Sequence, residues 1–272
     1  MPDLVRLSDP AGTSTAELAP ERGALLTRFT VGGADILFLD QPTFDDATKN
    51  VRGGIPVLYP TPGKLAGDQW AYGSRQGSLP QHGFARNQPW QVVTVRKSTA
   101  TVRLQSAGQA RWPWPNVVEL TFTVAARSLR IDQRVTNTGT EIMPFGLGFH
   151  PYFRVLDADK SKVRVETAAR SAFDNVTKQI VEFDHIDLTA KEVDLHLIDH
   201  GASTGSLTWD GREIRLSASP EFTHWVVWTL AGRDFVCLEP WTSPGNGINV
   251  GQIRTVEPGH TESFFVELTY AE

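Results

Sequence analysis

Three short segments of the chain place groups that can exchange protons or donate hydrogen bonds among glycines, prolines and aromatic residues. The segments are residues 79–86, 146–153 and 235–241. Between them they supply an amide, a guanidinium, two imidazoles and a carboxylate, on Gln81, Arg86, His82, His150 and Glu239. Such a set offers titratable groups and fixed hydrogen-bond donors to one polar ligand. The chemistry that these residue types suggest is proton transfer to and from a sugar.

Glu239 is the candidate proton acceptor. The alternation of its strand-like segment places Glu239 on one face with Cys237, opposite Leu238. Pro240 follows and is expected to end regular strand pairing there. A carboxylate at the end of an apolar strand is partly desolvated, which raises its pKa and makes it a usable base near neutral pH. The alternative is a strand-end glutamate that pairs with an arginine.

Two histidines are candidate proton donors, although either could instead be a packed core residue. His150 precedes Pro151, which favours an extended backbone at the histidine. Tyr152 and Phe153 follow and offer aromatic surface for the apolar face of a sugar. His82 gains meaning from the amide and the guanidinium in the same segment. The other histidines, to which we assign no role, are His185, His196, His200, His224 and His260.

Arg52 is a further candidate for ligand binding. It precedes Gly53 and Gly54, and two glycines let the backbone approach a ligand closely. A guanidinium at this point can bind hydroxyl groups or a phosphate through two parallel hydrogen bonds. The alternative is a turn with a solvated arginine.

Common cofactor and metal motifs do not occur in the sequence. There is no phosphate-binding glycine loop before a helix, no dinucleotide fingerprint and no His-Glu-x-x-His motif. His82, His150 and Glu239 could in principle form a site of two histidines and one carboxylate for a metal ion. Their spacing does not require such a site, so we predict neither a metal nor a cofactor. Cys237 is interpreted as a small apolar core residue rather than a nucleophile.

The composition argues against several classes of protein. The 272 residues carry a net charge of −5 without a basic tract, which makes nucleic-acid binding unexpected. Cys237 is the single cysteine, so no disulfide forms within the chain. The first residues lack the pattern of a signal peptide, and no apolar run approaches the roughly 20 residues that cross a bilayer. We expect a cytoplasmic protein without membrane contact, either a monomer or a weak dimer.

Short alternating strands separated by turns dominate the chain. Apolar and polar residues alternate through residues 128–137, and the dipeptide Asp210-Gly211 and residues 32–35 predict hairpin turns. Further strands are expected at residues 25–31, 36–39, 90–95, 101–104, 117–124, 163–166, 207–209, 213–216, 224–230, 235–239 and 264–269. Helical periodicity is weak, and the chain has 23 glycines and 17 prolines. We predict a single domain over residues 1–272, an all-β sandwich of mainly antiparallel strands.

The order of the motifs resembles that of the aldose 1-epimerase (mutarotase) superfamily, most closely its hexose-6-phosphate 1-epimerase branch. The resemblance rests on residues 52–56, 79–86, 150–153 and 239–242. It implies a galactose mutarotase-like β-supersandwich, in agreement with the strand pattern. It also implies an isomerase that interconverts the α and β anomers of a hexose or hexose 6-phosphate without a metal or cofactor.

The resemblance further implies a role for each candidate residue. Glu239 matches the catalytic base, His150 the catalytic acid, and His82 a second active-site histidine that polarises the sugar. The positions that hold the substrate correspond to Arg52, Gln81, Arg86 and Asp194. Glu239 would take the proton of the anomeric hydroxyl while His150 protonates the ring oxygen. The ring would then open, rotate about the C1–C2 bond and close to the other anomer.

The sequence leaves the substrate and the reaction open. Arg52 and Arg86 favour a phosphorylated hexose, but residues 57–63 lack the glutamine typical of the phosphate branch, so a free aldose is the alternative. A carbohydrate-binding protein without catalysis is a second reading of the same residues. A glycoside hydrolase or lyase on a related sandwich is the third, with Asp194 as the possible partner of Glu239 because hydrolases generally use two carboxylates.

Overall fold

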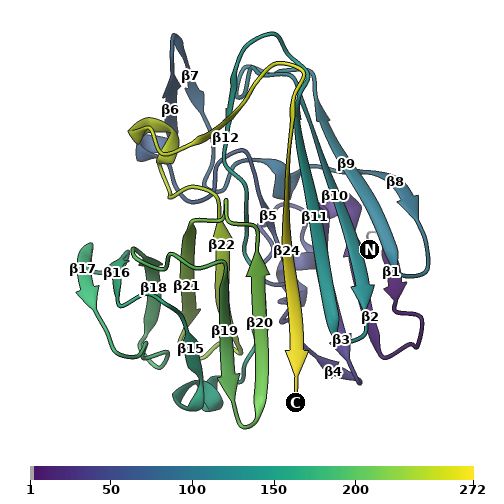
Figure 1. Ribbon diagram of the computed structural model, residues 1–272, viewed down its shortest axis with the longest axis vertical. Coiled ribbons are helices and arrows are strands. Elements are labelled where there is room, and N and C mark those ends of the chain that lie inside the picture. The colour runs from purple at the N-terminus through teal and green to yellow at the C-terminus, as the bar shows by residue number, and fades with distance from the viewer. Residues whose placement is uncertain (1–2) are drawn as a thin grey trace.

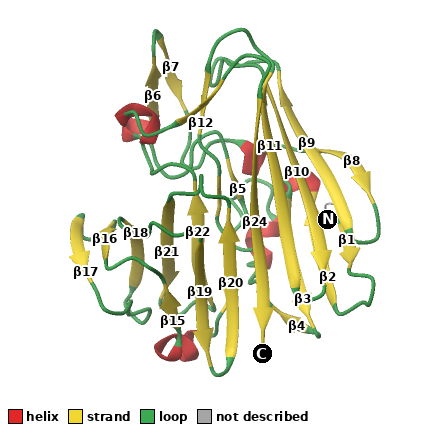
Figure 2. Cartoon of the chain, in the orientation of Figure 1, coloured by secondary structure: helices red, strands yellow, loops and turns green. Residues whose placement is uncertain are grey.

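The computed structural model describes residues 3–272, and antiparallel β-strands make up most of this part of the chain (Figure 1). Figure 2 shows how little of it is helical. The helical segments are α1 (Gln41–Asp45) and the 3-10 turns η1 (Pro20–Arg22), η2 (Ala66–Asp68), η3 (Ala85–Asn87), η4 (Asp157–Lys162) and η5 (Gly247–Val250). The predicted all-β class is therefore confirmed. Met1 and Pro2, which the single-domain prediction includes, lie outside the described residues.

The longest strands form one eight-stranded sheet, called the long sheet below. Its strands, in spatial order, are β15 (Arg164–Glu166), β19 (Thr204–Trp209), β20 (Arg212–Ala218), β24 (Thr261–Ala271), β11 (Ser128–Asn137), β10 (Asn116–Ala125), β9 (Thr99–Ser106) and β8 (Gln91–Val95). Neighbours pair antiparallel throughout. In β10 and β11 the residues facing the core alternate with half-exposed ones, as the period of two predicts.

A second eight-stranded sheet, called the cleft sheet, carries the candidate residues. Its strands, in order, are β17 (Gln179–Glu182), β16 (Ser171–Asp174), β18 (Glu192–Leu197), β21 (His224–Leu230), β22 (Phe235–Trp241), β13 (Gly148–Phe149) and β5 (Val57–Leu58), and β14 (Tyr152–Arg154) also pairs with β22. In Figure 1, β17, β16 and β18 extend to the left of β21 and β22.

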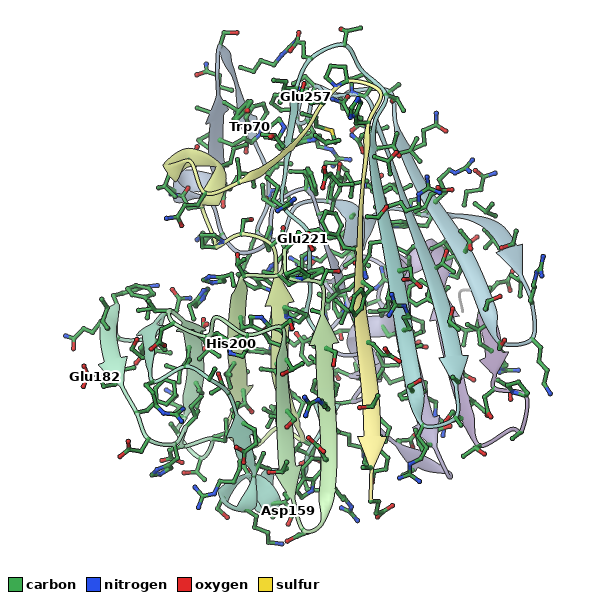
Figure 3. The ribbon with its side chains drawn as sticks, viewed as in Figure 1. Trp70, Asp159, Glu182, His200, Glu221 and Glu257 are labelled. Atoms are coloured by element: carbon green, nitrogen blue, oxygen red, sulfur yellow. The ribbon has the colours of Figure 1, made fainter. Side chains whose placement is uncertain are left out.

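Three small sheets complete the chain. They consist of β1 (Val5–Ser8), β2 (Ser14–Ala19), β3 (Leu25–Val31) and β4 (Ala34–Asp35), of β12 (Met143–Phe145) with β23 (Arg254–Val256), and of β6 (Gln69–Tyr72) with β7 (Arg75–Ser78). The β6–β7 hairpin stands above the cleft sheet, and Figure 3 labels its residue Trp70. The Trp70 ring packs against Trp112 and Trp114, with centroids 5.3 and 5.4 Å away, which fixes the hairpin to the body of the molecule.

The core lies between the long sheet and the cleft sheet. Leu238 of β22 points into it, and a Cβ built on Gly205 of β19 would lie 3.3 Å from the Leu238 side chain. Cys237 belongs to a separate apolar cluster with Tyr152 and Phe235. The strand therefore has one face in the core and the other towards the outer surface of the cleft sheet, as its alternation predicts.

Both predicted hairpins form, but one predicted strand does not. Asp210 and Gly211, at φ 46° and 79°, form the predicted turn between β19 and β20. Residues 36–39 were expected to be a strand, but the hairpin after β3 closes on the short β4, and Leu37 and Leu39 form only isolated bridges to other segments. The two residues of β4 complete the hairpin, so the chain after it is free to run alongside β14.

Pro240 does not end β22, contrary to the sequence prediction. The strand runs to Trp241, and Pro240 lies opposite Trp225 of β21. On its other side, pairing with β14 stops at Cys237 and pairing with β13 is at Trp241. A residue without an N–H is tolerated where a strand changes partners.

Within residues 3–272, no helix is long and apolar enough to cross a membrane.

Candidate active site

A cleft of about 600 Å³ opens on the outer face of the cleft sheet. The residues singled out from the sequence come from five separate parts of the chain, and all of them line this cleft. They are Arg52, Gln81, His82, Arg86, His150, Asp194 and Glu239. The structure thus brings the whole predicted set together, while the chemical role of each residue stays a prediction.

Strand register explains why distant residues meet on one face. Directly opposed residues of antiparallel strands point to the same side of a sheet. Glu239 of β22 is opposite Val226 of β21, and Val226 is opposite His196 of β18. Two positions away on β18, Asp194 is opposite Trp228. The two rows place these side chains on the floor of the cleft.

Glu239 is buried at the floor of the cleft, with 1% of its surface exposed. Burial raises the pKa of its carboxyl well above the usual value, and the negative charge of Asp194 adds to this effect. The indole Nε1 of Trp241 donates a hydrogen bond of 3.2 Å to Oε2, which favours the ionised form and partly opposes the rise. The other carboxyl oxygen, Oε1, is left for a second partner.

That partner is His150, which follows β13. Its Nδ1 lies 3.3 Å from Glu239 Oε1, although in the described chain Nδ1 makes no hydrogen bond of good geometry. The imidazole stacks on the Tyr152 ring at 4.6 Å and 9°, which fixes its plane. Burial, reinforced by the positive charge of Arg86, lowers the pKa of His150 to about 3, while the charge of Asp194 acts in the opposite direction.

The two pKa shifts determine which group of the pair carries the proton. With the pKa of the carboxyl raised and the pKa of the imidazole lowered, the neutral form of both groups is favoured and the shared proton sits on Glu239. The same shifts make the Glu239 carboxylate a stronger base and the His150 imidazolium a stronger acid whenever the proton lies on the histidine. Because the groups are coupled, apparent pKa values belong to the pair.

His82 lies in a tight turn that fixes its ring. Its backbone has φ 66°, and its N–H donates to the Gly63 carbonyl at 2.7 Å. The Gly63 N–H in turn donates to His82 Nδ1 at 3.0 Å. Burial and the charge of Arg86 lower the pKa of His82 well below its usual value, so the ring is neutral. A neutral imidazole that accepts at Nδ1 carries its proton on Nε2, so Nε2 is a donor.

The remaining predicted residues surround this donor. The Gln81 amide nitrogen lies 3.2 Å from His82 Nε2. Arg86 Nη2 donates to the Gln81 carbonyl at 2.8 Å, which holds the guanidinium close to both side chains. Arg52 lies at the exposed rim, before Gly54, whose positive φ of 65° brings the backbone against Leu26. The cleft thus has a cationic side as well as a carboxylate floor.

Asp194 is held by two neighbours. Burial alone would raise the pKa of its carboxyl, but hydrogen bonds from His196 and Asn175 outweigh burial, so the pKa is lowered. Asn175 Nδ2 donates to Oδ2 at 2.7 Å, and His196 Nε2 lies 3.4 Å from Oδ1. Asp194 is therefore an ionised acceptor inside the cleft.

Two cleft residues were missed by the sequence reasoning, which assigned them no role. His196 and His224 both line the cleft, and their rings are joined through Nδ1 and Nε2 at 2.8 Å. A signal for His196 was present, because it is two residues from Asp194 and alternation places both on one face. His224 gave no such local signal, since the β18–β21 register alone brings it to His196.

The group of possible metal ligands found among the described residues differs from the set considered from the sequence. Ligand atoms of His150, Cys237 and Glu239 lie within 4.8 Å of one another. Cys237, rather than His82, completes this group because it shares a strand face with Glu239. The thiol is buried among apolar residues and its pKa is raised well above the usual value by burial.

Comparison with known proteins shows the family and the fold of the chain. A family model described as Aldose 1-epimerase matches residues 3–269. The crystal structure of the Slr1438 protein from Synechocystis sp. PCC 6803 is similar over 100% of this chain and 96% of that one, with a TM-score of 0.94 and 33% identity. The crystal structure of a galactose mutarotase-like protein from Lactobacillus casei ATCC 334 is similar over 99% of this chain and 100% of that one, with a TM-score of 0.80 and 18% identity. The predicted galactose mutarotase-like fold is confirmed.

Curated relatives match a smaller part of the chain. A Cenchrus ciliaris protein with the provisional name glucose-6-phosphate 1-epimerase is 32% identical over 148 residues, which cover 49% of this chain and 41% of that protein. Protein LacX of Lactococcus lactis subsp. lactis is 23% identical over 242 residues, covering 78% of this chain and 81% of its own length. The match to the first of these relatives thus spans less than half of its length.

Proposed function

Because the chain belongs to the aldose 1-epimerase family, we propose that it interconverts the α and β anomers of a hexose or hexose 6-phosphate through ring opening. One observation carries the proposal: Glu239 Oε1 and His150 Nδ1 lie 3.3 Å apart on the floor of the cleft. The two oxygens that exchange protons in this reaction, O1 and O5, are bonded to the same carbon. An acid and a base that serve them must therefore lie next to each other.

The two proton transfers of the reaction fit a pair of groups that holds one proton between them. In the ionic form of the pair, Glu239 takes the proton of the anomeric hydroxyl and His150 gives its proton to the ring oxygen. The C1–O5 bond breaks, C1 becomes an aldehyde, and both protein groups are now neutral. After rotation about C1–C2, Glu239 returns a proton to O1 and His150 takes the proton of O5, which closes the other anomer.

The buried environment supports the open-chain stage of this cycle. The neutral pair, which the pKa shifts of Glu239 and His150 favour, is the state that accompanies the aldehyde. The cyclic sugar needs the ionic form, in which the same proton lies on His150 instead of Glu239. Because the resting pair is also neutral, forming the ionic pair costs free energy, which is recovered when the aldehyde forms.

The donors beside the pair are suited to hold the sugar. His82 presents Nε2–H, and the Gln81 amide and the Arg86 guanidinium lie next to it. We infer that they bind hydroxyl groups or the carbonyl oxygen and keep C1 within reach of the pair during rotation. Arg52 and Arg86 supply the positive charge that a 6-phosphate needs, and the provisional name of the Cenchrus relative supports a phosphorylated hexose.

Anomer exchange tests the proposal directly. We expect saturation transfer NMR to show fast exchange between the anomers of glucose 6-phosphate, glucose or galactose in the presence of the wild-type protein. Glu239→Gln should lower the exchange rate by roughly 10²–10⁴, the usual contribution of one acid or base, and should still bind the sugar. Exchange of the phosphate alone would assign the hexose-6-phosphate type, and exchange of the free sugars the general aldose type.

A matched control comes from the edge of the same sheet. Glu182→Gln removes a carboxylate from the outer strand β17, outside the cleft, and should leave the exchange rate unchanged (Figure 3). Sugar binding by the wild type without any acceleration of exchange would contradict the proposal and leave a carbohydrate-binding protein. Release of new reducing ends from an oligosaccharide would instead identify a hydrolase.

A further inference from the structure

A second polar chain runs through the cleft beside the proton-transfer pair. Asp194 Oδ1 lies 3.4 Å from His196 Nε2, and His196 Nδ1 lies 2.8 Å from His224 Nε2. Asp194 and His196 belong to β18 and His224 to β21, which are neighbours in the cleft sheet (Figure 1). All three side chains line the cleft, and none of these contacts is used in the ring opening.

The indole of Trp241 fixes the two imidazoles relative to Glu239. The His224 ring stacks on Trp241 with centroids 5.6 Å apart and an angle of 30°, and the His196 ring meets it edge-on at 5.5 Å. The same indole donates its N–H to Glu239. The histidines are therefore held at a set position with respect to the Glu239 carboxyl.

The direction of each hydrogen bond follows from the charge of Asp194. The lowered pKa of this carboxyl makes it an ionised acceptor, so His196 donates from Nε2. In the tautomer that leaves His196 Nδ1 bare, this nitrogen accepts, and His224 donates from Nε2. Burial lowers the pKa of His224 to about 3, so this ring is neutral, and with its proton on Nε2 its Nδ1 keeps the lone pair. Among residues 3–272 we find no hydrogen-bond donor to that nitrogen.

We propose that Nδ1 of His224 accepts a hydrogen bond from a hydroxyl group of the bound sugar, and that Asp194 and His196 hold His224 in the accepting tautomer. His224 is then a substrate-binding residue, and His196 a positioning residue that acts through it. The proposal rests on the proposed function for the class of ligand only, a sugar. It adds a subsite that binds one hydroxyl group and is separate from Glu239 and His150, which transfer the protons.

The chemistry of this subsite limits what can bind in it. A lone pair backed by a carboxylate attracts a hydroxyl proton and repels a phosphate, which is anionic at neutral pH and has little proton to offer. A phosphorylated sugar would therefore place its phosphate near Arg52 and Arg86 rather than at His224. The subsite thereby sets the orientation of the ring in the cleft.

Deoxy sugars and a ring-preserving variant test the contact. His224→Phe keeps an aromatic ring against Trp241 and removes both nitrogens. We expect one monodeoxy analogue of the sugar to bind the wild type about two- to tenfold more weakly than the parent, the value of one such hydrogen bond. The affinity of His224→Phe for the parent sugar should be lower than that of the wild type by the same factor. This variant should bind the deoxy analogue as tightly as it binds the parent. Calorimetric dissociation constants measure both, without turnover.

The positioning role of His196 has its own readout. His196→Asn retains an oxygen that can accept from His224 Nε2, and it should keep the wild-type discrimination against the deoxy analogue. His196→Leu offers no acceptor, so His224 loses its preferred tautomer. The ratio of the affinities for the parent sugar and the deoxy analogue should then fall towards one. A merely structural role would affect the parent and the deoxy sugar equally in both variants.

A measurement on the unmodified protein guards against variants that fail to fold. Binding of the parent sugar should move the ¹⁵N resonance of His224 Nδ1 away from the position of a bare acceptor nitrogen, and the deoxy analogue should not. Equal penalties for every deoxy sugar in the wild type and His224→Phe, with an unmoved resonance, would overturn the subsite. Discrimination against one deoxy sugar and a shifted resonance, but no anomer exchange, would instead refute the proposed function and leave the subsite standing.

Discussion

At the scale of single residues, the chemistry of the cleft depends on pKa shifts in opposite directions on two neighbouring groups. Burial raises the pKa of the Glu239 carboxyl and lowers that of the His150 imidazole, and the two meet at 3.3 Å. A lone buried carboxylate would be costly, and a neighbour that can carry the same proton removes much of that cost. Trp241 adjusts the balance because its N–H favours the ionised carboxyl.

The Trp241 hydrogen bond leads to a testable pH effect. Exchange requires a pair that holds one proton, so its rate should fall at high pH when that proton is lost. Trp241→Phe removes a bond that lowers the pKa of Glu239, so the pKa rises and the alkaline limb of kcat/KM should move to higher pH. The pH dependence of anomer exchange for the two proteins measures the shift. An unmoved limb, or one at lower pH, would show that Glu239 does not carry the shared proton.

At the scale of elements, register and tight turns position the reacting groups. The rows across β18, β21 and β22 place Asp194, His196 and Glu239 on one face. His82 instead depends on a turn in which it and Gly83 both have positive φ, 66° and 70°. A Cβ at Gly83 would lie 2.2 Å from the Tyr59 carbonyl oxygen, so this position admits only glycine.

A pair of glycine substitutions separates strain from crowding. Gly83→Ala should lower the free energy of unfolding by roughly 2–5 kcal/mol, because it combines a left-handed backbone with a clash against Tyr59. Gly211→Ala has a similar φ of 79° but no atom within 4 Å of the new Cβ, so the loss should be about 1–2 kcal/mol. Urea unfolding gives both values. Equal losses would mean that the turn at Gly83 yields without cost.

At the scale of the whole molecule, two large sheets enclose one core and leave the outer face of the cleft sheet for chemistry. Leu238 and its neighbours on β22 fill the core, while Glu239 on the same strand reaches the cleft. The fold therefore buries ionisable groups at the boundary between core and cleft. His150 is buried and His224 is partly buried, and in both the pKa is lowered to about 3.

The buried histidines predict a loss of stability in acid. A depressed pKa in the folded state means that the unfolded chain binds more protons below its own pKa of 6.5, so stability is complete above pH 6.5 and falls towards pH 3. Each such histidine contributes a slope of about 1.4 kcal/mol per pH unit within this window. The raised pKa of Glu239 acts in the opposite sense, because its contribution is present at low pH and lost as pH rises.

Comparison with a variant isolates one histidine from the opposing carboxyl. Unfolding free energies of the wild type and His224→Phe should change in the variant's favour by about 1.4 kcal/mol per pH unit as pH falls below 6.5. The Glu239 contribution is common to both proteins and cancels. Parallel pH profiles of the two proteins would mean that His224 titrates alike in the folded and unfolded states.

The sequence by itself determined the strand pattern and the predicted site residues, because both depend on local chemistry. Alternation in residues 128–137 and the Asp210-Gly211 turn reflect the chain's own geometry, and they were predicted correctly. Gln81, His82 and Arg86 are a few residues apart, so their meeting needs one turn. The family resemblance then linked this segment to His150 and Glu239 before any contact was known.

Only the tertiary structure decided which distant groups touch. His196 and His224 are 28 residues apart, and the register of β18 against β21 alone makes them neighbours. The continuation of β22 through Pro240 likewise depends on a change of partner strand that no local signal marks. Burial, which shifts the pKa values of Glu239 and His150, arises from every element packed around them. A sequence lists its donors and acceptors, but the distances and the solvent exclusion that govern their chemistry exist only when the sheets are assembled.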